Sequence, residues 1–258
     1  MYIENYIKYK VMNKINPMAA IKDGWRLTKE HFIVSLGLVL AYMAISLLMG
    51  FFPTEGFMGT ITMVLNFFIE AVWTLGLIRI AVDVVDGEEP RFGAFGEVMP
   101  RLGHYIVMMV ILAVIVLIPV SIICAIGAAT CGIALTTLAA FDLSLLSTMW
   151  IWILLSSVLA IYICLRMFFA PYLLVDRNMG VVEAMKTSWK ASEPIQGKIL
   201  AFLLLSILIV IVGLLCVVVG VFVSAVILIY AQAHFYRQAF PAGLQDPLLV
   251  EDTNVVVQ

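Results

Sequence analysis

The chain has 258 residues, of which 64% are hydrophobic and only 12% are charged. A soluble domain needs more charged surface, so this composition excludes that class and predicts an all-α integral membrane protein. The net charge of −2 decides little, because the positions of charges matter more than their sum in a membrane protein. We expect membrane lipids as partners, leave open a second membrane protein, and expect no nucleic acid and no cofactor.

Residues 1–30 form a polar and basic lead without the short apolar core of a cleavable signal peptide. We therefore expect the N-terminus to stay in the cytoplasm. A membrane domain is predicted over residues 31–238, followed by a mildly acidic cytoplasmic tail over 239–258 that we expect to be flexible.

Six apolar segments are predicted to cross the bilayer, because a crossing helix needs about 20 residues at about 1.5 Å each. Pro119 should kink or end the third segment, and Pro171 lies near the inner end of the fourth. The predicted crossings lie at about 31–52, 57–85, 105–128, 149–174, 199–215 and 218–237.

The last two crossings come from one apolar run that is too long for a single passage. We divide this run near Gly213–Gly220 into a hairpin, which returns Arg237 to the cytoplasmic side. One long tilted helix with a re-entrant end is the alternative.

The lysine and arginine residues, 15 in all, fall in four clusters separated by long apolar stretches. The loops predicted to be external, at about 53–56, 129–148 and 214–219, contain no lysine or arginine. Basic residues mark cytoplasmic loops, so we expect an inner or plasma membrane protein with both termini inside. The external segment over 128–148 is too apolar for a free loop and is predicted to lie on or in the outer leaflet.

A short pattern is repeated before the first and fifth crossings. Ala20–Arg26 and Ala184–Lys190 both read as alanine, an apolar residue, lysine, any residue, a small residue, tryptophan and a base. A diverged copy without tryptophan is predicted over 92–102, so the fold would be three hairpins, each preceded by an amphipathic interfacial helix. Trp prefers the headgroup level and Lys or Arg meets phosphate, although such helices often only anchor a crossing. The lipid-contact candidates are Lys22, Trp25, Arg26, Lys186, Trp189 and Lys190.

Several short motifs resemble a group of bacterial membrane proteins. They are the lead with Trp25, the segment Asp86–Pro90, Tyr172–Arg177 with the following Ala184–Trp189, and the closing Tyr236–Arg237. The group includes the membrane domain of glycerophosphoryl diester phosphodiesterases and stand-alone relatives of uncharacterised function. The resemblance implies the membrane fold and a connection with lipids. It implies no active site, because the catalytic chemistry of the two-part enzymes belongs to a separate soluble barrel.

No motif of a metalloprotease, hydrolase or nucleotide-driven protein occurs, so we expect no catalytic residues and no enzymatic activity. His31, His104 and His234 lie where crossings meet the cytoplasm, and interfacial placement is favoured over a metal site. The cysteines lack a paired C-x-x-C spacing and are expected to be free.

Glu70, near the middle of the second crossing, is the principal polar anomaly. A charge at that depth costs about 2.5–3.5 kcal/mol on insertion scales, so it should be protonated, paired or facing water. Arg166 in the fourth segment is the expected partner, and the alternatives are an interhelical link and a proton or cation relay.

Other spacings predict packing and not ligand binding. Arg79 and Asp83 are one helical turn apart and should pair. The small residues of the pairs Gly37/Ala41 and Gly220/Ser224 should allow close helix packing.

Two functions remain open. The first is a non-enzymatic module that binds lipid or a partner protein in envelope or lipid homeostasis. The second is a small-solute transporter or channel that uses Glu70 within the bundle. An enzyme acting on lipid headgroups is less favoured, because the internal acids have no recognisable catalytic partners.

Overall fold

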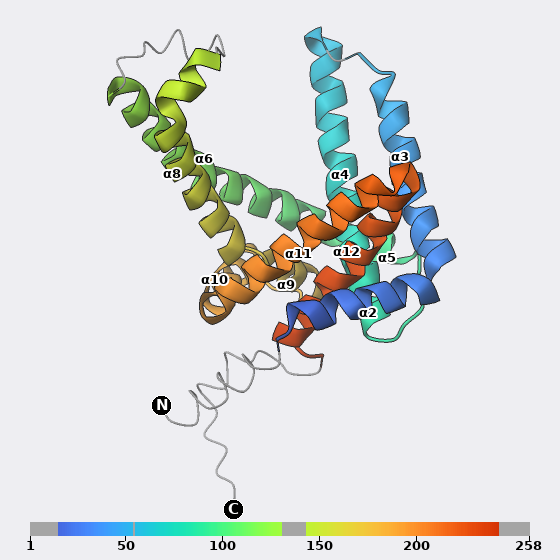
Figure 1. The fold of residues 1–258 in the computed structure, drawn as a ribbon. Helices are drawn as coiled ribbons and strands as arrows, with labels where there is room; N and C mark the ends of the chain where they lie inside the picture. The colour runs from blue at the N-terminus through green and yellow to red at the C-terminus, as the bar shows by residue number, and fades with distance from the viewer. Residues whose placement is uncertain (1–14, 54, 131–142, 243–258) are drawn as a thin grey trace, which may run out of the picture.

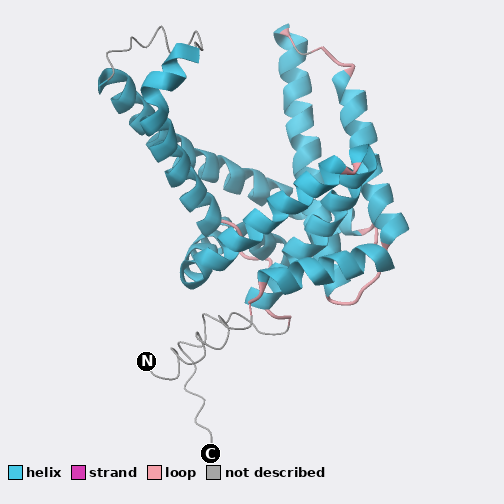
Figure 2. Cartoon of the chain, viewed as in Figure 1, coloured by secondary structure: helices cyan, strands magenta, loops and turns pink. Residues whose placement is uncertain are grey.

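The computed structural model describes residues 15–53, 55–130 and 143–242, and every regular element in them is a helix (Figure 2). Most of the predicted external segment over 128–148 and most of the tail over 239–258 lie outside the described residues. The all-helical prediction is confirmed for the part that is described.

The first unit consists of α2 (Pro17–Glu30), α3 (Phe32–Gly50) and α4 (Gly56–Val85). Asn16 caps α2, since its side-chain oxygen accepts hydrogen bonds of 3.0 and 3.3 Å from two amides of the first turn. α4 begins at Gly56, whose φ of 67° lies in the left-handed region that favours glycine. α4 runs beside α3 (Figure 1).

The second unit contains the short α5 (Ala94–Val98) and η1 (Met99–Arg101), then α6 (Leu102–Thr130) and α8 (Leu143–Arg166). Pro119 lies inside α6 and does not end it. The pair α6 and α8 extends away from the pair α3 and α4 (Figure 1).

The third unit follows a short connection. Its elements are α9 (Ala170–Asp176), α10 (Val181–Ser192), η2 (Glu193–Ile195), α11 (Gln196–Leu215) and α12 (Val217–Ala239). α2, α5, α9 and α10 lie together at one end of the molecule, here called the base (Figure 1).

The structure divides the fourth predicted crossing and locates the break in the last apolar run. The fourth predicted crossing, 149–174, is divided, because α8 ends at Arg166 and α9 begins at Ala170. Pro171 lies in the first turn of α9, where its missing N–H leaves no helical hydrogen bond unmade. The last apolar run contains two helices that meet at Cys216, and not one continuous helix.

Five helical runs in the described residues are long and apolar enough to cross a membrane, which indicates a multi-pass membrane protein. In the run Ala94–Ala129 only 6% of the most apolar window is buried inside the protein, so most of its apolar side chains face away from the rest of the chain, as on a lipid-facing helix. The five runs are Phe32–Gly50, Gly56–Val85, Ala94–Ala129, Trp150–Asp176 and Val181–Leu215.

The protein core lies towards the base, where α4, α9, α11 and α12 meet. Phe169, Phe202 and Phe235 are fully buried there. The ring centroid of Phe235 lies 4.7 Å from that of Phe202 and 6.0 Å from that of Phe169. These stacked aromatic rings join three helical segments that are distant in sequence.

Of the two predicted small-residue contacts, the one at Gly220 is confirmed and the one at Gly37 is not. An added Cβ at Gly220 would collide with the backbone of Gly213, so α11 and α12 approach closely there, as expected. An added Cβ at Gly37 would meet no atom within 4 Å, so the predicted packing through Gly37 is wrong.

Candidate functional site

The helix α2 packs most extensively against α12, across the base. An added Cβ at Gly24 would lie 2.8 Å from both the carbonyl oxygen of Ile227 and the backbone nitrogen of Ala231. Only glycine therefore permits this approach. A contact of 3.2 Å between the Asp23 carboxylate and His234 Nε2 links the same two helices at their edge.

An open groove of about 570 Å³ lies between α2, α11 and α12. Its volume falls within the range of about 300–1,000 Å³ that is usual for small-molecule sites. The Ser224 hydroxyl donates to backbone oxygens of Gly220 (2.8 Å) and Ile209 (3.2 Å), so even this polar lining group is satisfied. The lining residues are Ile21, Trp25, Leu208, Ile209, Val212, Gly213, Cys216, Gly220, Val223, Ser224 and Ile227.

Trp25 lies at the exposed edge of the groove. Its side chain is half exposed, with 46% of its area accessible, and it lines the groove from α2. The Lys29 ammonium lies 5.7 Å from the centroid of the Trp25 ring. Lys22 is exposed, whereas the guanidinium of Arg26 contacts Asp23 at 3.3 Å and Glu30 at 3.9 Å.

The second copy of the sequence repeat is used differently. Lys186 and Lys190 are exposed on α10, but Trp189 is partly buried. The guanidinium carbon of Arg166 lies 5.0 Å from the Trp189 ring centroid, and the Tyr162 ring meets Trp189 edge-on at 6.1 Å. The repeated motif thus places one tryptophan beside a groove and the other against a cation.

The predicted pair of Glu70 with Arg166 is wrong. Arg166 donates to the Tyr162 hydroxyl at 2.8 Å and to the Trp189 carbonyl at 3.1 Å, and it lies 3.5 Å from the Glu193 carboxylate. These partners lie on α8, α10 and η2, so Arg166 joins the fourth segment to the base and does not reach α4. The error arises because depth counted along two helices does not say which faces meet.

Glu70 is exposed on α4 and lies close enough to Tyr105 of α6 for an electrostatic interaction. Thr74, one turn nearer the base, hydrogen-bonds to the buried Tyr105. Glu70 therefore lies on the side of α4 that faces the beginning of α6.

An ion-pair network at the base unites residues from three of the short motifs. Arg237 donates to both carboxylate oxygens of Asp176 at 2.7 Å, and to those of Asp86 at 2.6 and 2.9 Å. The Tyr236 hydroxyl donates to Asp176 at 2.7 Å. Sequence reasoning quoted these residues in separate motifs but did not predict that they meet, although an acid or a base at the inner end of each unit was a visible signal.

A second charged group lies beside α5. The predicted pair of Arg79 with Asp83 is confirmed at 3.3 Å, and Arg79 also lies 3.4 Å from Glu97. Arg91 approaches the buried Asp83 at 3.5 Å. These contacts join the end of α4 to the segment that leads into α6.

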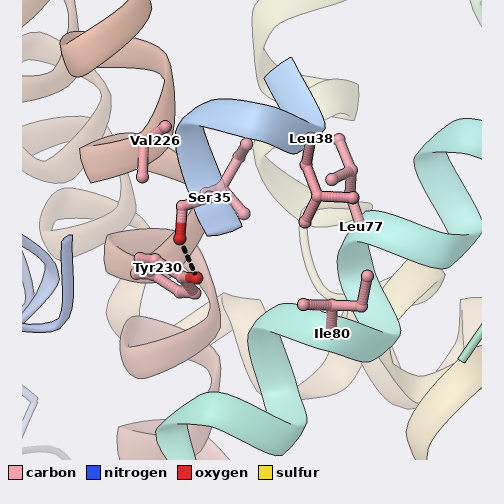
Figure 3. Close-up of a pocket in the computed structure, with 7 residues that line it drawn as sticks. Ser35, Leu38, Leu77, Ile80, Val226 and Tyr230 are labelled. Atoms are coloured by element: carbon pink, nitrogen blue, oxygen red, sulfur yellow. Dashed lines mark hydrogen bonds between the residues drawn. The ribbon is translucent and has the colours of Figure 1, made fainter. Parts of the chain in front are cut away.

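A small cavity between α3, α4 and α12 is closed by a hydrogen bond of 2.5 Å between the Ser35 and Tyr230 hydroxyl oxygens (Figure 3). Its volume of about 10 Å³ suffices for no more than about one water molecule. Most of its lining is apolar, so it is a packing feature and not a ligand site; the apolar lining residues are Leu38, Leu77, Ile80, Val226 and Ile229.

Within the described residues, no three histidine, cysteine or acidic side chains are grouped to hold a metal ion. Cys124, Cys164 and Cys216 are free, and Cys131 lies outside the described residues. Comparison of the chain with protein-family models, with curated proteins and with solved structures finds no match.

Proposed function

We propose that this protein is a non-enzymatic membrane module that binds lipid through its base and takes part in envelope or lipid homeostasis. In this proposal it crosses a bacterial inner membrane six times as three hairpins, with both termini in the cytoplasm. Each hairpin is introduced by a short helix lying at the inner interface. α12, which is not one of the five described runs that are long and apolar enough to cross by length and composition, supplies the sixth crossing.

The groove between α2, α11 and α12 carries this proposal. It joins apolar side chains of α11, such as Leu208 and Val212, to Trp25 on α2. A lipid has the same order of parts, because its apolar chain is followed by an interfacial glycerol group. An acyl chain therefore suits the groove better than a polar metabolite does.

Blocking the groove tests the proposal. Leu208 lines the groove and Ile207 does not, yet both side chains are 56% exposed on α11. Leu208→Trp should reduce the phospholipid that stays bound to the purified protein in native mass spectrometry, and the matched Ile207→Trp should leave it unchanged. Lipid-free wild type, or equal retention by both variants, would contradict lipid binding in the groove.

A transporter or channel is the second candidate, and the exposure of Glu70 on a crossing helix favours it. A carboxyl group at that depth needs water, a proton or a partner. In liposomes under an imposed proton or cation gradient, a transporter should lose coupled flux on Glu70→Gln. Absence of flux from wild type would count against the transporter proposal. That result would leave the lipid-binding proposal standing.

A further inference from the structure

The rim of the groove has a defined chemical pattern along α2. Residues three and four positions apart lie on the same side of a helix. Ile21 and Trp25, four apart, both line the groove. Lys22 and Lys29, three before and four after Trp25, therefore flank the tryptophan on the solvent side of the rim, and the 5.7 Å contact between Lys29 and the Trp25 ring agrees with this placement.

The acidic side chains of α2 contact groups other than the two lysines. Asp23 contacts His234 at 3.2 Å and Arg26 at 3.3 Å, and Glu30 lies 3.9 Å from Arg26. These contacts compensate Arg26, which lies between the two lysines along α2, and they engage both acidic groups with partners other than Lys22 and Lys29. Within the described part of the chain, Lys22 and Lys29 enter no ion pair, so the positive charge beside the groove is uncompensated.

We propose that the groove is a site for an anionic phospholipid, and this inference rests on the lipid-binding function proposed above. One acyl chain lies along α11 and α12, the glycerol region lies at Trp25, and the phosphate lies between the ammonium groups of Lys22 and Lys29. The single occupant follows from charge complementarity, because an apolar trench that opens between two unpaired cations matches an apolar chain bearing an anionic head.

The size of the preference follows from the two lysines. Each basic residue near an anionic headgroup contributes a factor of about five in affinity, so the pair should favour an anionic over a zwitterionic lipid by about 25-fold. Because both lysines are exposed, high salt should reduce the preference.

The test compares phosphatidylglycerol with phosphatidylcholine carrying identical chains, each with a fluorescent acyl group, added to the full-length protein in neutral detergent. Wild type should bind the first lipid about 25-fold more tightly. The double variant Lys22→Gln/Lys29→Gln should bind both lipids alike. The control Arg101→Gln, which removes a partly exposed cation on η1, an element that does not line the groove, should retain the preference.

Each remaining outcome bears on one of the two proposals. Equal binding of the two lipids by wild type, or an unchanged preference in the Lys22/Lys29 double variant, would overturn the headgroup assignment and leave the acyl-chain groove standing. Binding of neither lipid would instead contradict the proposed function. Glycerol phosphate should not displace the lipid, because it lacks the chain; displacement would overturn the assignment in favour of a soluble phosphate compound.

Discussion

Replacing Arg237 by methionine should destabilise the folded protein by about 3–5 kcal/mol, because the change strands a buried carboxylate. The side chains of Arg237 and Asp176 are only 12% and 8% exposed, and two contacts of 2.7 Å join them. Methionine keeps an apolar stem beside Tyr236, so the loss reports mainly the charge. Among the described residues, the variant would leave Asp176 with the 2.7 Å hydrogen bond from the Tyr236 hydroxyl as its remaining side-chain contact.

The contribution of Asp86 should be much smaller. Its side chain is 31% exposed, so water can solvate the carboxylate once Arg237 is gone, and Asp86→Asn should cost about 1 kcal/mol or less. Adding Asp176→Asn to Arg237→Met removes the stranded charge and should recover about half of the loss.

Equilibrium unfolding in mixed detergent micelles, followed by circular dichroism, measures these differences. The reasoning fails if Arg237→Met lies within about 1 kcal/mol of wild type, since a buried bidentate pair cannot be that weak when one partner is removed. It also fails if the double variant is no more stable than Arg237→Met.

Three further substitutions can be judged by the same unfolding measurement. Gly24→Val should lower the free energy of unfolding by about 1–3 kcal/mol, because the added side chain meets backbone atoms at 2.8 Å. Gly37→Val should be nearly neutral. Equal effects of the two variants would argue against the close packing of α2 on α12. Tyr230→Phe should cost about 1 kcal/mol through loss of the bond to Ser35, and no change would mean that this bond is not maintained in the membrane. Arg166→Gln should cost about 2–3 kcal/mol, since the hydrogen bonds and ring contacts of Arg166 are lost while its acidic neighbour Glu193 is exposed. A stabilised variant would refute the role of Arg166 in joining α8 to the base.

Local features were predictable from the sequence because they depend on residues near one another in the chain. The apolar runs predicted helices of crossing length, and the spacing of Arg79 and Asp83 predicted an ion pair one turn apart. The break near Cys216 was likewise predictable, because one helix of that length would exceed the bilayer thickness.

The sequence predicted part of the groove's rim but not the groove itself. Trp25 and Lys22 were recognisable as interfacial residues, but nothing local indicated that α11 and α12 would present an apolar trench to them. The matching motif on α10 shows the limit of such reasoning, since Trp189 packs on Arg166 instead of beside a groove.

The sequence by itself determined the membrane class, the helical runs and the contacts within single helices, because hydrophobic length and helical periodicity are local properties. Only the tertiary structure decided which helix faces meet. It separated Glu70 from Arg166, and it brought Arg237 to Asp176 and Asp86, which lie 61 and 151 positions away. Such pairings depend on the rotation and crossing of whole helices, which side-chain packing across many residues sets together.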